Sequence, residues 1–242
     1  SEVEDLKRKL EEDLERHKKD VKRLKDEAER RLEEHKRLVE ELERRIKKLL
    51  DELKDRNPEV KELLRVVKEI VELIRRVLEK HLKLLEEIIR LLATVLDKHL
   101  DVLREIIRLI ARVLDLKEAG LDEEDLKREA EDIARKAEEL LRDSARTAED
   151  IARRAEEALK ESKDDLKRIL DRARELLDDI RRKKVVPKDV LRDLERILTE
   201  LAKALKDLID NSRRTLEKLL KALRDLIRES KETLEEVLRR TD

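Results

Sequence analysis

Three residue types in this chain, histidine, serine and threonine, recur at a fixed spacing and carry side chains that can do chemistry. Each type recurs at positions i and i+18, in the pairs His17 and His35, His81 and His99, Ser144 and Ser162, Ser212 and Ser230, and Thr215 and Thr233. An imidazole beside a hydroxyl can act as a base with its nucleophile, as part of a metal site, or as a buried hydrogen-bonding pair. Which of these applies depends on the elements that position the side chains.

This i, i+18 spacing is the repeat of an undistorted α-helix. An ideal helix has about 3.6 residues per turn, so the spacing equals five full turns and both members of a pair point the same way from the helix axis. The clearest repeat is KHLKLLEEIIRLLATVLD, from Lys80 to Asp97, which aligns without a gap with KHLDVLREIIRLIARVLD, from Lys98 to Asp115. A heptad repeat would instead require about 3.5 residues per turn and a left-handed supercoil. The sequence therefore predicts nearly straight, untwisted helices.

Composition and helix-breaking residues predict an all-α fold with four long helices. Charged residues make up 53% of the chain and hydrophobic residues 38%, with no aromatic residue, no Cys, one Gly and two Pro. A Leu/Ile/Val/Ala core with a Glu/Lys/Arg surface is typical of long amphipathic helices. Capping and breaking residues mark the boundaries: Ser1 with Glu4, Asn57-Pro58, Gly120, Asp122, and Val185 to Pro187. We expect a single four-helix domain, with helices over residues 2–55, 59–116, 122–184 and 188–241.

Short turns between long helices predict an up-down-up-down antiparallel bundle. In such a bundle, the residue numbers of facing positions on two neighbouring helices have the same sum at every level. The histidines and serines satisfy this condition for all three hairpins at once. They form one predicted layer of His17, His99, Ser144 and Ser230, adjoined by Thr233, and another of His35, His81, Ser162 and Ser212, adjoined by Thr215. The same register predicts an apolar layer of Leu53, Leu63, Ile180 and Leu194.

The polar layers have three interpretations, of which a buried hydrogen-bond network is favoured. Such a network specifies register, because a slip leaves a buried polar group unpaired at about 1–3 kcal/mol. A structural zinc site would need four good ligands, whereas each layer offers two histidines, and Asp165 lies only at the edge of one apolar stripe. A Ser–His nucleophile would need an oxyanion hole and a substrate pocket, which this pattern does not indicate. We therefore predict no enzyme, no catalytic residue, no cofactor and no metal.

Neutral buried histidines have a consequence for stability. Burial disfavours the charged imidazolium and lowers the histidine pKa in the folded chain. The unfolded chain then binds protons more readily, so stability is expected to decrease as the pH falls below about 6.5. The sequence thus predicts an acid-sensitive bundle.

The charge pattern and hydropathy exclude several classes of partner. There are 64 Lys and Arg against 65 Asp and Glu, interspersed along the chain, which argues against nucleic-acid binding. No apolar run approaches the length of about 18 residues that a membrane span needs, and no signal peptide is apparent. No small-molecule substrate is indicated either. We expect a soluble chain, cytoplasmic on recombinant expression, although no native compartment is indicated.

The width of the apolar stripe differs between helices and bears on assembly. On a helical wheel the second helix is apolar over about 180–200°, the fourth over about 160°, and the first and third over about 120°. The second helix is widened by Leu82, Leu84, Ile89 and Leu91. Two arrangements explain this breadth: a flattened bundle in which helices two and four meet across the short diagonal, or an oligomer interface on helix two. Both a monomer and a homo-oligomer through the second helix therefore remain open.

The whole chain resembles de novo designed helical bundles with buried hydrogen-bond networks, of the straight type with an 18-residue repeat. The resemblance lies in this period, the Leu/Ile/Val core, the Glu/Lys/Arg surface, turns such as Asn57-Pro58, and His, Ser and Thr at core centres. A natural coiled-coil or spectrin-like segment would be expected to carry aromatic residues and a less regular repeat. The resemblance implies high stability and a role as a scaffold or self-assembly building block. It also bears on the pH response, since some members use buried histidines for pH-triggered disassembly. The alternative role is a helical binding module or oligomer subunit that uses the broad face of the second helix.

Overall fold

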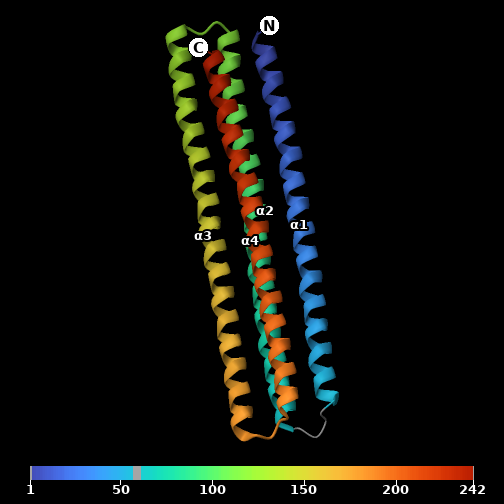
Figure 1. Cartoon of the computed structure of the whole chain (residues 1–242). Helices are drawn as coiled ribbons and strands as arrows, with labels where there is room; N and C mark the ends of the chain where they lie inside the picture. The colour runs from blue at the N-terminus through green and yellow to red at the C-terminus, as the bar shows by residue number, and fades with distance from the viewer. Residues whose placement is uncertain (1, 57–60, 242) are drawn as a thin grey trace. The chain divides into compact units, whose positions relative to one another are not determined.

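The computed structural model describes residues 2–56 and 61–241, and over these ranges the chain forms four α-helices and no strand (Figure 1). The helices are α1 (Glu2–Arg56), α2 (Lys61–Glu118), α3 (Glu123–Lys183) and α4 (Lys188–Thr241). Short turns join α2 to α3 and α3 to α4, and the four helices confirm the prediction of an all-α, antiparallel four-helix bundle. Within the described ranges, no helix carries an apolar stretch long enough to cross a membrane. The predicted caps at Ser1 and at Asn57-Pro58, and the predicted start of the second helix at residue 59, lie outside the described residues.

The turn between α2 and α3 is set by the only glycine of the chain. Gly120 has φ 86°, in the left-handed region that favours glycine. Its N–H donates to the carbonyl of Lys117 at 3.2 Å, and the N–H of Leu121 donates to the carbonyl of Leu116 at 3.2 Å. These two bonds form a Schellman motif, with Gly120 at the predicted position just past the helix end. Because the last turn is completed in this way, α2 continues to Glu118, two residues beyond the predicted end.

The turn between α3 and α4 uses a left-handed residue that is not glycine. Lys184 has φ 54°, and its N–H donates to the carbonyl of Arg181 at 3.3 Å. The helix therefore ends at Lys183, one residue before the predicted boundary. A left-handed conformation costs a residue with a Cβ about 1–2 kcal/mol. A lysine therefore does not predict a left-handed helix end, as a glycine would. After the turn, the carbonyl of Pro187 accepts a hydrogen bond from the N–H of Leu191 at 3.2 Å, which closes the first turn of α4.

The described residues group into two compact units, and each helix contributes to both. Unit 1 comprises the described residues of Ser1–Glu29, Ile88–Arg153 and Glu217–Asp242, and unit 2 comprises Arg30–Glu87 and Arg154–Leu216. Each unit thus contains one segment of each of the four helices. His17, His99, Ser144 and Ser230 belong to unit 1, whereas His35, His81, Ser162 and Ser212 belong to unit 2. Each predicted polar layer therefore lies within a single unit.

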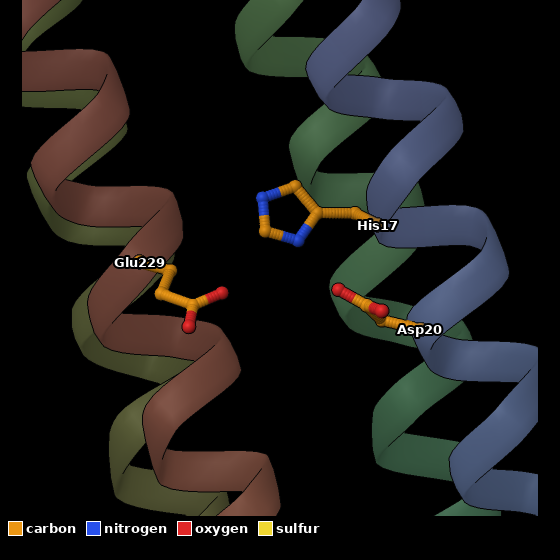
Figure 2. Close-up of side chains that lie close together, drawn as sticks. All are labelled: His17, Asp20 and Glu229. Carbon is orange, nitrogen blue, oxygen red and sulfur yellow. The ribbon is translucent and has the colours of Figure 1, made fainter.

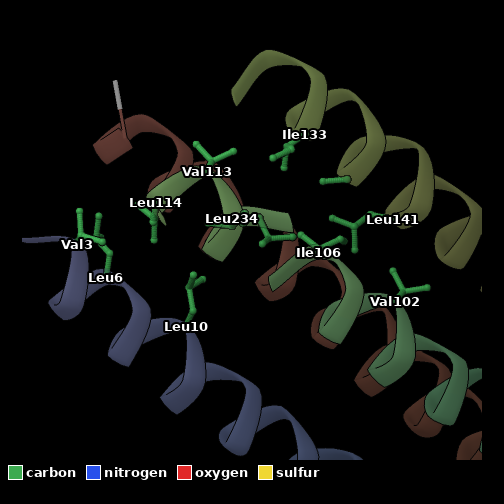
Figure 3. Close-up of a cluster of buried hydrophobic side chains, with 12 residues drawn as sticks. Val3, Leu6, Leu10, Val102, Ile106, Val113, Leu114, Ile133, Leu141 and Leu234 are labelled. Carbon is green, nitrogen blue, oxygen red and sulfur yellow. The ribbon is translucent and has the colours of Figure 1, made fainter. Parts of the chain in front are cut away.

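Unit 1 has an aliphatic core near the turn between α2 and α3 (Figure 3). Ile106, Ile110 and Leu114 of α2 belong to this core and are 0% exposed. Buried side chains from the other helices surround them, among them Val3, Leu6 and Leu10 of α1, Ile133, Ala137 and Leu141 of α3, and Leu234 of α4. Burying one such aliphatic side chain contributes about 1.5–3 kcal/mol, so this cluster supplies much of the driving force for packing the four segments together.

Unit 2 buries the four residues of the predicted apolar layer. Leu63 and Leu194 are 0% exposed, and Leu53 and Ile180 are also buried. None of these side chains carries a hydrogen-bonding atom, so burial needs no compensating partner. The hydrophobic effect alone favours their position.

Ion pairs between neighbouring helices record the register within each unit. In unit 1, the Nζ atoms of Lys7 and Lys25 on α1 bind the carboxylates of Asp115 and Asp97 on α2. The two pairs have the same sum of residue numbers, as antiparallel helices require. In unit 2, Arg154 and Arg172 of α3 pair with Glu87 and Glu69 of α2 in the same manner. Because most of these side chains are well exposed, solvent screens the pairs and each contributes little to stability. Their value here is that they indicate the register of the helices.

Candidate functional site

The polar layer of unit 2 draws one side chain from each helix. His35 comes from α1, His81 from α2, Ser162 from α3 and Ser212 from α4, and all four are at most 5% exposed. The helical period places each of them at the centre of its apolar stripe, so folding takes them out of water together. A buried polar group without a hydrogen bond is costly, which makes their partners decisive.

The hydrogen bonds of this layer link all four helices. His81 bridges two serines, because its Nδ1 lies 2.8 Å from Ser162 Oγ and its Nε2 lies 2.8 Å from Ser212 Oγ. His35 Nε2 lies 3.1 Å from the same Ser212 Oγ. Ser212 Oγ also donates to the carbonyl of Leu208, one turn earlier on α4, at 3.1 Å. The bond between His81 and Ser212 joins α2 directly to α4, which is the contact that the flattened arrangement of helices requires.

These contacts fix the direction of every hydrogen bond in the layer. The single proton of Ser212 is donated to Leu208, so its oxygen has to accept from the Nε2–H groups of both His35 and His81. His81 is then the neutral tautomer with an unprotonated Nδ1, which accepts from the hydroxyl of Ser162. Every donor of the network therefore has an acceptor while both imidazoles are neutral. The protons are assigned from this network and its geometry.

Burial favours the same neutral state in unit 2. Loss of solvation lowers the pKa of His35 to about 4. Loss of solvation, followed by the charge that His35 would carry, lowers the pKa of His81 to about 4. The two rings are close, with centroids 5.4 Å apart, so a proton on one disfavours a proton on the other.

The polar layer of unit 1 uses the same residue types but fewer cross-helix bonds. His17, His99, Ser144 and Ser230 are at most 8% exposed. His99 Nε2 lies 2.9 Å from Ser230 Oγ, which donates to the carbonyl of Leu226 at 3.0 Å. The hydroxyl of Ser144 donates to the carbonyl of Leu140 on its own helix at 3.3 Å and not to a histidine. Only α2 and α4 are thus joined by hydrogen bonds of this layer.

Three imidazole nitrogens of unit 1 are buried without a hydrogen-bond partner. They are both ring nitrogens of His17 and Nδ1 of His99. The two rings lie edge to face, with centroids 6.5 Å apart. Each unpaired buried polar group costs about 1–3 kcal/mol, so this layer is less favourable than its counterpart. Among the described residues, the remaining unpaired buried side-chain atom is Asp13 Oδ2, which also belongs to unit 1.

Burial also lowers the histidine pKa values of unit 1. Loss of solvation and the neighbouring His17 lower the pKa of His99 to about 4. The pKa of His17 is lowered by loss of solvation and then by the charge of Arg16, whereas Asp20, Asp13 and Glu229 act in the opposite direction. His17 is thus the histidine of this layer that faces negative charge.

Three residues considered at the sequence level lie outside the networks. Thr215 is buried and Thr233 is half-buried, but neither hydroxyl forms a hydrogen bond with the histidines or serines among the described side chains. Asp165 is engaged at the surface edge of unit 2, where its Oδ2 accepts a hydrogen bond from Lys80 Nζ at 3.0 Å. The structure therefore brings His35, His81, Ser162 and Ser212 together in unit 2 and His17, His99 and Ser230 together in unit 1, without these neighbours. Ser144 is buried in unit 1 but bonds only to its own helix.

Two carboxylates beside His17 were missed by sequence reasoning. One nitrogen of His17 and one carboxylate oxygen each of Asp20 and Glu229 lie within 4.8 Å of one another. Figure 2 shows the three side chains pointing toward one another from α1 and α4. A signal was present, because Asp20 follows His17 by three residues on the same helix face and Glu229 precedes Ser230. A search confined to the centre of the apolar stripe does not detect residues at its edge.

The Ser–His contacts do not form an accessible nucleophilic site. Ser162 and His81 are within hydrogen-bonding distance, but both are buried, so a substrate cannot reach the hydroxyl. The hydroxyl proton of Ser212 is donated to a backbone carbonyl and not to a base. A nucleophile needs both an oriented base and exposure to its substrate. What the unit 2 arrangement can do is hold four helices at one level.

Comparisons with known proteins give little information on function. No family model and no curated protein matches the chain. The chain is similar to a solved structure described as a computationally designed three helix bundle, at 20% sequence identity and a TM-score of 0.36. The match covers 86% of this chain and 92% of that chain. A likeness at this TM-score does not decide the fold or the function, which have to be inferred from the residues themselves.

Proposed function

We propose that this chain is a designed structural scaffold, or self-assembly building block, without enzymatic activity. The observation that supports the proposal best is the polar layer of unit 2, in which each assigned donor has an acceptor. Four side chains from four helices meet there through hydrogen bonds of 2.8–3.1 Å. A satisfied and inaccessible network is suited to specifying a structure, whereas catalysis requires exposed and reactive groups.

The network would act as a register device. Displacing any one helix by a residue rotates its side chains by about 100° and removes the serine or histidine from the layer. The remaining partners would then be buried without hydrogen bonds, at about 1–3 kcal/mol for each group. Leucine and isoleucine alone discriminate less between neighbouring registers, since an aliphatic contact has no direction.

The tautomers provide a direct test of the network. We expect His35, His81 and His99 to carry their proton on Nε2, because each Nε2 faces a serine oxygen whose own proton is donated elsewhere. The ¹⁵N chemical shifts of the imidazole nitrogens at pH 7.5 distinguish the two tautomers. Protonation of His81 on Nδ1 would contradict the proposed network.

The proposed scaffold is also acid-sensitive. Three histidine pKa values are lowered to about 4, and that of His17 is lowered as well. A group whose pKa is lower in the folded chain stabilises it fully above the unfolded value of about 6.5, and this stability is lost as the pH falls toward 4.

A variant with all four histidines replaced by leucine tests the pH response. We expect the wild type to lose more unfolding free energy than this variant when the pH is lowered from 7.5 to 4.5, as measured by denaturant titration. The carboxylates of the surface ion pairs are present in both proteins and act as an internal control. Equal losses in the two proteins would contradict a histidine-based response.

A second candidate function is assembly or partner binding through α2. Its support is the row of half-buried leucines beside the core stripe, including Leu73, Leu84, Leu91 and Leu109. Light scattering on the purified protein tests this candidate. A dimer mass that reverts to a monomer in Leu84→Glu or Leu91→Glu would support it, and a monomer mass for the wild type at millimolar concentration would count against it.

A further inference from the structure

We propose that His17 and Asp20 of α1, together with Glu229 of α4, bind a divalent transition-metal cation such as Zn²⁺. This inference goes beyond a scaffold role and does not depend on it. It rests on three potential ligands of the right chemical types that lie together at the edge of the unit 1 polar layer (Figure 2). Imidazole nitrogen and carboxylate oxygen are both common zinc ligands.

His17 supplies the evidence that points to a ligand. Its side chain is 1% exposed, yet neither ring nitrogen has a hydrogen-bond partner. Such an imidazole has lost the hydrogen bonds that its nitrogens make to water in the unfolded chain and has gained none in their place. Binding a cation through one nitrogen would satisfy that atom, whereas His35, the equivalent residue of the unit 2 layer, already donates to Ser212.

Asp20 and Glu229 can complete the coordination with small movements. A tetrahedral zinc site with ligand bonds of about 2.0–2.2 Å places its ligand atoms about 3.3–3.6 Å apart. The three atoms already lie within 4.8 Å of one another. Glu229 is exposed and Asp20 is only half-buried, so both side chains can adjust their rotamers toward His17. Three protein ligands leave a fourth position for water, as in open zinc sites.

The electrostatic surroundings favour a cation. Among the described residues, the surface pocket at this place is lined by Asp20, Glu229, Glu232 and Glu236, with Arg16 as the one basic residue and Thr233 beside them. Glu236 is already paired with Lys9 at 3.2 Å, so the negative charge at this place comes mainly from the other three carboxylates. Arg23 lies 3.5 Å from Asp20, but its side chain is 73% exposed, and an exposed ion pair of this kind contributes little. A divalent cation can therefore displace that arginine at a small cost.

Burial also keeps His17 in the form that binds metals. Metal binding requires the neutral imidazole, and loss of solvation followed by Arg16 lowers the pKa of His17. Protons therefore compete less with the metal at neutral pH than they would at an exposed histidine. Asp20, Asp13 and Glu229 counteract this effect only in part.

The second layer provides an internal control. Eighteen residues after His17 and Asp20, α1 carries His35 and Leu38. Because α4 runs antiparallel to α1, the position equivalent to Glu229 lies eighteen residues earlier, at Asn211. Leu38 has no ligand atom and is 43% exposed. Although the two layers share their histidines and serines, only unit 1 is expected to bind a metal. The proposed stoichiometry is therefore one ion per chain.

Isothermal titration calorimetry with Zn²⁺ on the EDTA-treated full chain at pH 7.5 tests the proposal. We expect one site per chain, and binding weakened by about tenfold or more in the isosteric variants Asp20→Asn and Glu229→Gln. His17→Leu should abolish the site. His35→Leu is the matched control and should bind as the wild type does. Helicity measured by circular dichroism verifies that each variant is folded.

A second metal distinguishes the proposed ligands from general surface binding. Co²⁺ in a four-coordinate site with one nitrogen and three oxygen ligands gives a visible absorption that weakly bound surface Co²⁺ lacks, and this absorption should disappear in His17→Leu. Absence of a saturable Zn²⁺ site in the wild type would overturn the proposal. So would binding that is unchanged in His17→Leu, or binding that is lost equally in His35→Leu.

Discussion

The two polar layers contain the same residue types at equivalent helical positions, but they differ in their hydrogen bonds. In unit 2, Ser162 donates to His81, and Ser212 accepts from two histidines. In unit 1, Ser144 donates to its own helix instead, and three imidazole nitrogens are left unpaired. Equal composition therefore does not ensure equal networks. The network differs because the hydroxyl of Ser162 donates to a histidine on another helix, whereas that of Ser144 donates to a backbone carbonyl of its own helix.

The difference extends to the residues that flank the histidines. In unit 2, His35 is accompanied by Leu38 on the same helix face, whereas in unit 1 His17 is accompanied by Asp20. The unit 1 layer therefore borders negative charge at a position where the unit 2 layer carries an aliphatic side chain. The unit 2 layer is suited to specifying register, whereas the unit 1 layer is suited to binding a cation.

The largest expected contrast between the layers is in their response to acid. The double variants His35→Leu/His81→Leu and His17→Leu/His99→Leu each remove one pair of histidines. A histidine with a pKa of about 4 in the folded chain loses about 3 kcal/mol of stabilisation when the pH falls from 7.5 to below 4. We expect the unit 2 variant to abolish the larger share of the acid-induced loss, because carboxylates near His17 favour its protonated form.

The measurement is the unfolding free energy from denaturant titration at a series of pH values. The curves should converge above pH 7.5 after correction for the stability of each variant, since all histidines are then neutral. The prediction is contradicted if the unfolding free energy falls more steeply with decreasing pH in His35→Leu/His81→Leu than in His17→Leu/His99→Leu.

An intermediate effect is expected from single substitutions at the two layers. His81→Leu removes two cross-helix hydrogen bonds and should destabilise the chain by about 2 kcal/mol. His17→Leu removes two unpaired buried nitrogens and should stabilise the chain by about 1 kcal/mol or more. Guanidinium unfolding in buffer containing EDTA at pH 7.5 measures both. Destabilisation by His17→Leu would indicate that its ring has partners in solution.

The smallest effect concerns the serines on α3. Ser162→Ala leaves Nδ1 of His81 without a donor and should cost about 1–2 kcal/mol. Ser144→Ala removes only a bond within α3, to the carbonyl of Leu140, and should cost less than about 0.5 kcal/mol. The same unfolding experiment compares them. Equal losses of unfolding free energy in the two variants would mean that Ser144 also forms a hydrogen bond with a histidine of its layer.

Much of the fold could be predicted because helical period and capping act locally. Gly120 indicated the end of α2, since glycine adopts the left-handed conformation without strain. Lys184 gave no such indication, although it adopts the same region, because a residue with a Cβ is usually disfavoured there. Capping at Ser1 and at Asn57-Pro58 stays a prediction.

The sequence by itself determined which residues lie at the centre of each stripe. The 18-residue repeat, which equals five helical turns, places His81 and His99 in the same direction, and the apolar residues around them ensure that this direction is buried. Such angular positions depend only on the regular backbone geometry of an α-helix, so the printed sequence is sufficient to derive them.

Only the tertiary structure decided which polar atoms meet. A hydrogen bond requires two atoms within about 3 Å, and side-chain rotamers and the spacing between helices change that distance by more than the bond tolerates. Ser162 reaches across to His81 for this reason, whereas Ser144 does not reach His99. The gathering of Asp20 and Glu229 around His17 has the same origin, because it depends on where α1 and α4 place their edges within unit 1.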